Sequence, residues 1–290
     1  MRAVKRGFVF GTALLAGLAI ADAQQTVLKV GYGAFTAPTA FIPNATDANF
    51  ATLDPNGTLV RGAMIEVVKA IAADAGFRVQ FVPFGSGGLG GSGGGGGGYG
   101  VGGTGQTAAL IDKTIDIILA APYPADQAPA DAKPTYDSSK PVYFTTEGLL
   151  AKKTDTKAYK TWDDLKGEVV GTLTGGIGDG ALQNAMLFKE VKTYDTMAEV
   201  ADAVNSSAVK AAVVPGAVNL AYQLQQGGGA YASLQLVKSY VPKFTFNVAI
   251  GVRRGDPTLA GIDRSLAKVK ADGTLKRIFA KYGIDSYLTK

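Results

Sequence analysis

The chain has 290 residues and a formal net charge of +5; 47% of its residues are hydrophobic and 18% are charged. This composition is globular, and the length favours two domains over one. The chain contains no histidine and no cysteine, which excludes a Ser-His-Asp triad, a thiol nucleophile, disulfides and a zinc centre. No basic run occurs, so we do not expect a nucleic-acid partner. We also expect no metal and no cofactor.

The first residues have the three parts of a secretory signal peptide. Arg2, Lys5 and Arg6 form a positive segment, an apolar run follows at residues 7–20, and A-D-A at residues 21–23 fits a cleavage site. An apolar run of about 14 residues is short for a membrane span, so an anchor is the weaker alternative. We therefore predict a cleaved signal peptide at residues 1–23 and a mature protein in the periplasm.

Hydrophobic periodicity predicts alternating strands and helices in the first half of the chain. VLKVGY at residues 27–32 reads as a strand, and a polar loop follows at 34–58. The segment 62–77 has apolar residues at helical spacing and stops at Gly76. The next elements are a strand at 79–82, a short helix at 107–113 and a strand at 115–121 that ends at P-Y-P. This order indicates a parallel sheet with helices on its faces.

The same alternation returns in the second half. The predicted elements are a helix within 161–167, a strand at 168–173, a helix that opens after the glycines at 175–180, a helix at 196–204, a strand at 211–214, a helix at 217–226, a strand within 242–257 and two helices within 259–283. The two series meet at residues 148–152. Two α/β lobes joined in this way leave a cleft between them, and such clefts are favoured ligand sites.

One segment fits neither series. Residues 85–105 contain 15 glycines in 21 positions, and almost nothing apolar offsets the entropy of ordering them. We predict a flexible surface loop at 85–105. A phosphate-binding P-loop is excluded because no Lys-Ser/Thr follows the glycines.

Seven pieces of the chain, in order over residues 27–285, resemble the periplasmic solute-binding proteins of the amino-acid-binding type (family 3) that serve ABC transporters. They are LKVGYG, GTLVRGAMIEVVKAIAADAGFRVQFVPF, ALIDKTIDIILAA, YDSSKPVYFTTEGLLAKK, TWDDLKGEVVGTLTGG, YDTMAEVADAV and the tail from VAIGVRRGDP to FAKYGI. The resemblance implies an α/β fold of the two-lobed, type II-like periplasmic-binding-protein class with a hinge of two crossing strands. Lobe one is expected at 26–147 plus 243–290, and lobe two at 150–240.

The sequence departs from this family at the expected ligand anchors. Relatives usually carry an arginine after the strand that matches DIILAA, and it clamps the carboxylate of the ligand. This chain has PYPADQ at residues 122–127, and no arginine between Arg78 and Arg253. Relatives usually place an aspartate for the ligand ammonium after the strand that matches AAVV, where this chain has Pro215-Gly216. We therefore expect a neutral or singly anionic solute, and poor binding of standard amino acids.

The remaining cleft positions supply aromatic rings and backbone groups. Tyr123 and Phe35 can stack on a solute, and the glycine turn after strand 168–173 can bring N–H groups to an anion; packing and a tight turn without ligand are the alternatives. Glu66 and Trp162 are interpreted as structural. The predicted ligand-binding residues are Phe35, Ala121, Tyr123, Thr174, Gly175, Gly176 and Pro215.

Three functions remain open at this point. The first is a monomeric binding protein, not an enzyme, that captures a small polar solute for an ABC permease. The second is a binding-fold accessory protein of a periplasmic, quinoprotein-type dehydrogenase, without a role in transport. The third is a carboxylate-based enzyme on the same fold, for which Asp126 and Asp179 are the only candidates at the cleft rim.

Overall fold

The computed structural model of the chain describes residues 25–33, 35–44, 49–84, 105–122, 136–174, 179–226 and 231–289. The predicted signal peptide and residues 85–104 of the glycine-rich tract lie outside these ranges. In the part of the chain that is described, no helix is both long and apolar enough to cross a bilayer.

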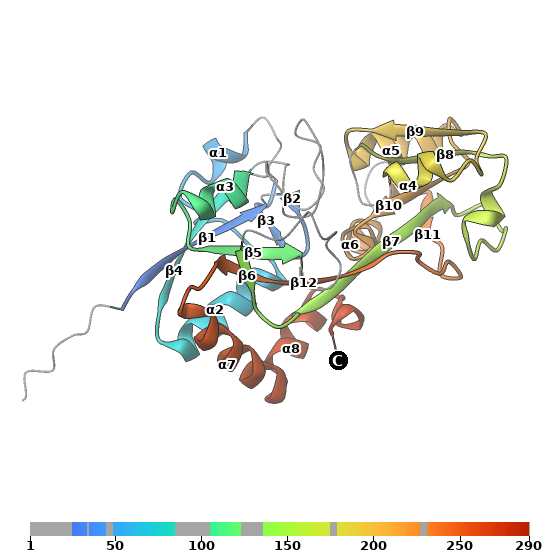
Figure 1. The fold of residues 1–290 in the computed structure, drawn as a ribbon. Coiled ribbons are helices and arrows are strands. Elements are labelled where there is room, and N and C mark those ends of the chain that lie inside the picture. The colour runs from blue at the N-terminus through green and yellow to red at the C-terminus, as the bar shows by residue number, and fades with distance from the viewer. Residues whose placement is uncertain are drawn as a thin grey trace, which may run out of the picture.

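A mixed sheet of ten strands runs through the described part of the molecule (Figure 1). Its main path has the order β4-β1-β5-β12-β7-β10-β8-β9, while β6 pairs with β12 and β11 pairs with β7. The strands are β1 Val27–Gly33, β4 Arg78–Phe84, β5 Ile117–Pro122, β6 Tyr136–Ser138, β7 Tyr143–Lys152, β8 Val169–Leu173, β9 Glu190–Tyr194, β10 Ala211–Pro215, β11 Leu234–Leu236 and β12 Thr245–Arg253. A separate hairpin is formed by β2 Phe35–Thr36 and β3 Ala40–Phe41.

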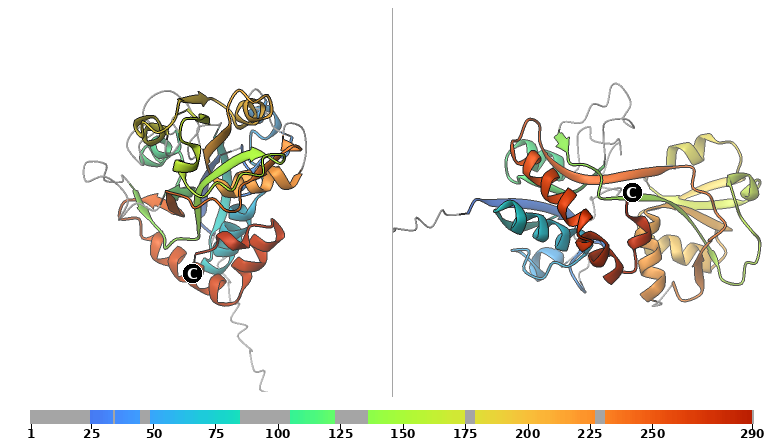
Figure 2. Two further views of the ribbon diagram at one scale, coloured as in Figure 1. Left: turned by 90° about the vertical axis from the view of Figure 1, so that its right-hand side faces the viewer. Right: turned by 90° about the horizontal axis from the view of Figure 1, so that it is seen from below.

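Helices pack against the sheet in both halves of the molecule. They are α1 Phe50–Leu53, α2 Ala63–Ala75, α3 Gly105–Ile111, the 3-10 helix η1 Trp162–Leu165, α4 Asp179–Asn184, α5 Met197–Asn205, α6 Ala217–Gln226, α7 Thr258–Ala271, α8 Thr274–Lys281 and the 3-10 helix η3 Asp285–Tyr287. The C-terminal helices α7 and α8 pack against α2, far away in the sequence (Figures 1 and 2).

The hydrophobic residues form separate clusters at the two ends of this sheet. One large cluster joins α2 to α7 and α8, with Ile71 and Phe279 among its buried side chains. Two others cover opposite faces of the sheet around β8 and β10: one contains Trp162 and Leu149, and the other contains α5 and Leu150. We call the part built on α2 lobe one and the part around β8 and β10 lobe two. The boundaries 26–147 plus 243–290 and 150–240 stay a prediction.

Strands β7 and β12 connect the two lobes. The first residues of β7, Tyr143–Thr146, pair antiparallel with Thr245–Val248 of β12. The following residues of β7 pair with β10 and then with β11, while β12 goes on to pair with β5 and β6. After their shared stretch, β7 therefore continues into lobe two and β12 into lobe one, and Figure 2 shows the two strands side by side between the lobes.

The structure adds elements that periodicity did not indicate. Strands β6, β9 and β11 are short or half exposed, and β7 carries a mixed polar and apolar sequence, so none has a clear alternating pattern. The expected polar loop at 34–58 contains the β2–β3 hairpin and α1. The expected helix within 161–167 is a single 3-10 turn, in which Asp164 accepts a hydrogen bond from the Thr161 N–H at 3.0 Å.

The N-terminus of α2 is fixed by the turn between β2 and β3. The N–H groups of Ala63 and Met64 donate to the carbonyls of Pro38 and Thr39, both at 2.9 Å. This close approach depends on Gly62, whose φ of 134° favours glycine. A Cβ on Gly62 would lie 2.3 Å from the Thr39 carbonyl oxygen.

We expect Gly62→Ala to lower the free energy of unfolding by about 2 kcal/mol or more, because backbone must move and the new residue holds a strained φ. Urea unfolding followed by circular dichroism measures the change. Gly261→Ala is the matched control: Gly261 lies in α7 with open space around its Cβ position, so alanine should stabilise by up to about 1 kcal/mol. Equal effects of the two substitutions would contradict this account of Gly62.

Candidate functional site

The strands of lobe two end at the edge that faces the connection between the lobes. Strands β8 and β10 are parallel and pair at Ala211 with Val170 and at Ala212 with Gly171, and Pro215 ends β10 while Thr174 follows the end of β8. Strand β7 enters from the opposite direction, and its Glu147 pairs directly with Pro215. The structure therefore pairs one predicted site residue, Pro215, with Glu147, and places a second, Thr174, just after the end of β8.

Of the other predicted site residues, the structure describes Ala121 completely and Phe35 by its backbone only. Ala121, at the end of β5, is fully buried in a small apolar cluster with Ile115 and Tyr136, so its side chain packs inside lobe one. The backbone of Phe35 pairs with Phe41 across the β2–β3 hairpin, and the side chain of Phe35 lies outside the description. The predicted contacts of Tyr123, Gly175 and Gly176 fall on residues outside the described ranges.

Glu147 is a buried acid that no local sequence feature marks as a site residue. Its side chain is 1% exposed, and it is the first residue of β7 beyond the pairing with β12. Its Oε1 accepts hydrogen bonds from the Tyr240 hydroxyl at 2.5 Å and from the Lys243 N–H at 2.8 Å. Its Oε2 has no hydrogen-bond partner among the described residues. The donors lie more than 90 positions away, so only the fold reveals the burial.

Aromatic side chains surround this acid. The Trp162 indole N–H donates to the Tyr240 hydroxyl at 2.8 Å, and the Trp162 ring lies 6.0 Å from that of Phe244. The Lys243 ammonium sits over the Trp162 ring, 4.3 Å from its centre. Burial, together with the hydrogen bond to Glu147 and the negative charge there, raises the pKa of Tyr240. Tyr240 therefore stays a neutral donor to Glu147, and Trp162 is structural, as its sequence suggested.

Two hydroxyl groups on the same face of the sheet are also buried and without a described partner. Thr145 precedes Glu147 by two positions in β7, and the period of two places both on one face. Thr172 of β8 shares this face, because it follows by two positions Val170, which belongs to the cluster that contains Trp162. The oxygens Thr145 Oγ1 and Thr172 Oγ1 have no partner among the described residues. Buried polar atoms normally have hydrogen-bond partners, so these two oxygens are exceptions among the described residues.

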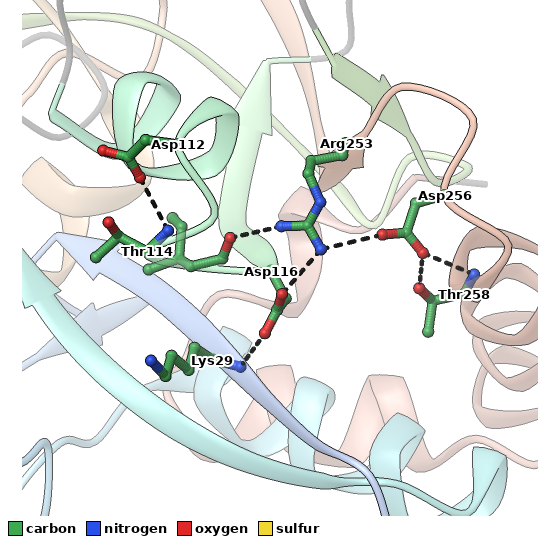
Figure 3. Close-up of polar contacts among 8 residues, drawn as sticks. Lys29, Asp112, Thr114, Asp116, Arg253, Asp256 and Thr258 are labelled. Atoms are coloured by element: carbon green, nitrogen blue, oxygen red, sulfur yellow. Dashed lines mark hydrogen bonds and ion pairs between the residues drawn. The ribbon is translucent and has the colours of Figure 1, made fainter.

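Arg253 is engaged in lobe one (Figure 3). Its guanidinium donates to the Ile115 carbonyl and to the Asp116 carboxylate, both at 2.8 Å, and approaches Asp256 at 3.4 Å. Asp116 also accepts from the Lys29 N–H at 2.9 Å. These contacts tie β12 to β5 and β1, so Arg253 is a structural residue and not a clamp for a ligand carboxylate.

A second connection between the lobes comes from α6. The Asn219 side-chain amide donates to the Ala37 carbonyl in the β2–β3 turn at 2.7 Å, and the ring of Tyr222 lies 6.2 Å from that of Phe41. Val218 is buried in the core cluster of lobe one. The lobes thus make side-chain contacts beyond the two connecting strands.

Other polar groups do not assemble a site. Asp179 opens α4 and accepts a hydrogen bond from Gln183 at 2.7 Å, while Asp126 lies outside the description. A cavity of about 440 Å³ opens at the far end of lobe two. Its lysines contact Asp155 and Ser207, so they are already engaged. No group of three or more acidic residues that could hold a metal occurs in the described ranges.

Comparisons with solved structures identify the fold. An ancestral arginine-binding protein bound to arginine is 25% identical, with a TM-score of 0.61 over 89% of this chain and 99% of that chain. An amino-acid ABC transporter substrate-binding protein from Streptococcus pneumoniae bound to L-arginine is 17% identical, with a TM-score of 0.62 over 91% and 97%. A histidine kinase sensor domain with similarity to periplasmic binding proteins is 19% identical, with a TM-score of 0.63 over 89% and 96%.

The chain therefore has the predicted two-lobed α/β fold of the periplasmic binding proteins, and its resemblance to the amino-acid-binding type is confirmed at the level of the fold. These solved structures are a binding protein, a substrate-binding protein and a sensor domain, which supports a binding role and not an enzymatic one. No family model matches the sequence, and no curated protein matches it either.

We expect Arg253→Met to lower the free energy of unfolding by about 1–2 kcal/mol, since it removes the side-chain donor to the Ile115 carbonyl and to one oxygen of the partly buried Asp116. Chemical denaturation gives this value. The control is Arg277→Met, because Arg277 lies exposed on α8 with contacts to Asp272 and Thr274 only. Arg277→Met should change the free energy of unfolding by no more than about 0.5 kcal/mol. A loss as large as that of Arg253→Met would show that the contacts in Figure 3 do not stabilise the fold more than exposed contacts do.

Proposed function

We propose that this protein is a periplasmic solute-binding protein that captures one small polar solute between its lobes and delivers it to an ABC importer. The proposal rests on the edge of lobe two at Thr174, Pro215 and Glu147. There, strand ends lie next to the strands that connect the lobes. Buried oxygens of Glu147, Thr145 and Thr172 have no hydrogen-bond partner among the described residues. Binding at such an edge is general for α/β sheets, because strand ends and loops leave a crevice there.

The way the lobes are connected supports capture by closure. Only β7 and β12 pair across the middle of the described sheet, so small backbone rotations in these strands can change the angle between the lobes. The contact of Asn219 with Ala37 and the packing of Val218 then hold the lobes together. A solute that contacts both lobes adds to these contacts and favours the closed form.

The binding role is tested on protein purified from periplasm. Native mass spectrometry should detect one small molecule per chain, and the protein should bind that molecule again after unfolding, dialysis and refolding. Isothermal titration calorimetry should then give a 1:1 complex with a Kd of about 1 μM or tighter, which corresponds to about −8 kcal/mol. A correctly refolded protein that binds neither the copurified material nor any small polar solute would contradict the proposal.

The importer role is tested separately, with the solute identified in this way. Deleting the gene should abolish high-affinity uptake of the radiolabelled solute, and a plasmid copy should restore it. The alternative, an accessory protein of a periplasmic dehydrogenase, predicts normal uptake and a loss of quinone-linked substrate oxidation. The result therefore distinguishes a transport protein from an accessory protein with the same fold.

A further inference from the structure

Two carboxylates of the described residues are almost completely buried, and they differ in one respect. Asp54 is fully buried and both of its oxygens are occupied: Oδ1 accepts from Thr58, and Oδ2 accepts from the Leu59 N–H at 3.1 Å and from the Tyr32 hydroxyl at 3.4 Å. Glu147 is 1% exposed, and only its Oε1 is occupied. The free oxygen of Glu147 is therefore not a general property of buried acids in this chain.

The described neighbours of Glu147 do not donate to Oε2. Its direct partner across the strands is Pro215, which has no N–H group. Both donors that do reach Glu147, the Tyr240 hydroxyl and the Lys243 N–H, go to Oε1. The ammonium of Lys243 sits over Trp162 instead, and no ion pair of the described residues includes Glu147.

A buried carboxylate without a cation is costly, and the cost falls when a cationic group donates to it. Charge-assisted hydrogen bonds are about twice as strong as neutral ones, so a cation satisfies Oε2 better than a neutral donor. Thr145 Oγ1, on the same face and also without a described partner, can accept a second N–H of the same cation. The rings of Phe246, which pairs with Thr145, and of Phe244, stacked on it at 6.3 Å, lie beside this position.

We propose that Glu147 is the charge anchor of the cleft and that the solute carries a protonated amine or amidinium group, whose N–H donates to Glu147 Oε2. This inference rests on the proposed function and names its ligand class: an organic cation with a short apolar part and no carboxylate. It replaces the neutral or singly anionic solute that the sequence suggested. The acid that binds the solute is then Glu147 on β7. It pairs with Pro215 on the neighbouring strand β10.

A panel of three chemical classes with equal chain length tests the charge of the ligand. The probes are primary amines and diamines of two to five carbons, with agmatine as a guanidinium compound, against the alcohols and the carboxylates of the same length. Thermal shift screening followed by calorimetry on refolded wild-type protein measures binding. At least one cation should bind, with an affinity about 100-fold or more above that of its alcohol and carboxylate counterparts.

Substitution then tests the residue. Glu147→Gln keeps the size of the side chain and an acceptor for Tyr240, and it should weaken binding of the cation about 100-fold or more. The matched control is Glu66→Gln. Glu66 also accepts from a tyrosine, Tyr282 at 2.7 Å, but lies on α2 in lobe one, so this change should alter the affinity less than threefold. Thr145→Val should weaken binding about 5- to 10-fold.

Each outcome decides between the two proposals. If an alcohol or a carboxylate binds as tightly as the amine, or if folded Glu147→Gln keeps the wild-type affinity for the cation, the inference is wrong and the binding function stands. If no class binds, the inference is wrong, and the binding function is decided separately by the solute that copurifies with the protein. If Glu147→Gln does not fold, the comparison of amine with alcohol on the wild-type protein and the Thr145→Val variant decide the question.

Discussion

The pairing of β7 with β12 is the interaction on which the remaining structure depends. For four residues the two strands pair with each other, and then each goes on to pair with the strands of one lobe. The C-terminal helices α7 and α8 can therefore return to α2. Backbone hydrogen bonds hold this crossing, and Asn219 and Val218 add further contacts between the lobes.

The same crossing creates the unusual environment of Glu147. The residue lies where β7 leaves β12 for β10, so Tyr240 and Lys243, on the segment leading into β12, meet it from one side. Pro215 meets it from the other side and cannot donate. The architecture that connects the lobes thus also fixes a half-satisfied carboxylate at their junction. If Glu147 binds the solute as we propose, one strand supplies both the connection between the lobes and the binding group, so binding and closure are coupled.

Much of the fold was predictable because local patterns determine it. The helix α2 follows from its apolar spacing and its end at Gly76, and β1 and β5 follow from short apolar runs. Of the predicted site residues, Thr174 and Pro215 lie at strand ends of lobe two and Ala121 packs inside lobe one; their contacts with a solute stay a prediction. Glu147 could not be found, because its burial depends on donors 93 and 96 positions away. An acid beside a glycine in T-T-E-G-L-L gives no local sign of such contacts.

The most direct test of this account is the distance between the lobes with and without solute. The chain has no cysteine, so cysteines introduced at the exposed Ala108 in α3 and the exposed Thr193 in β9 carry two spin labels and no others. Pulsed electron resonance should show one distance distribution without solute and a shorter, narrower one when the solute found by calorimetry is added. An unchanged distribution at saturating solute would contradict the account, because the solute would then bind without closing the lobes.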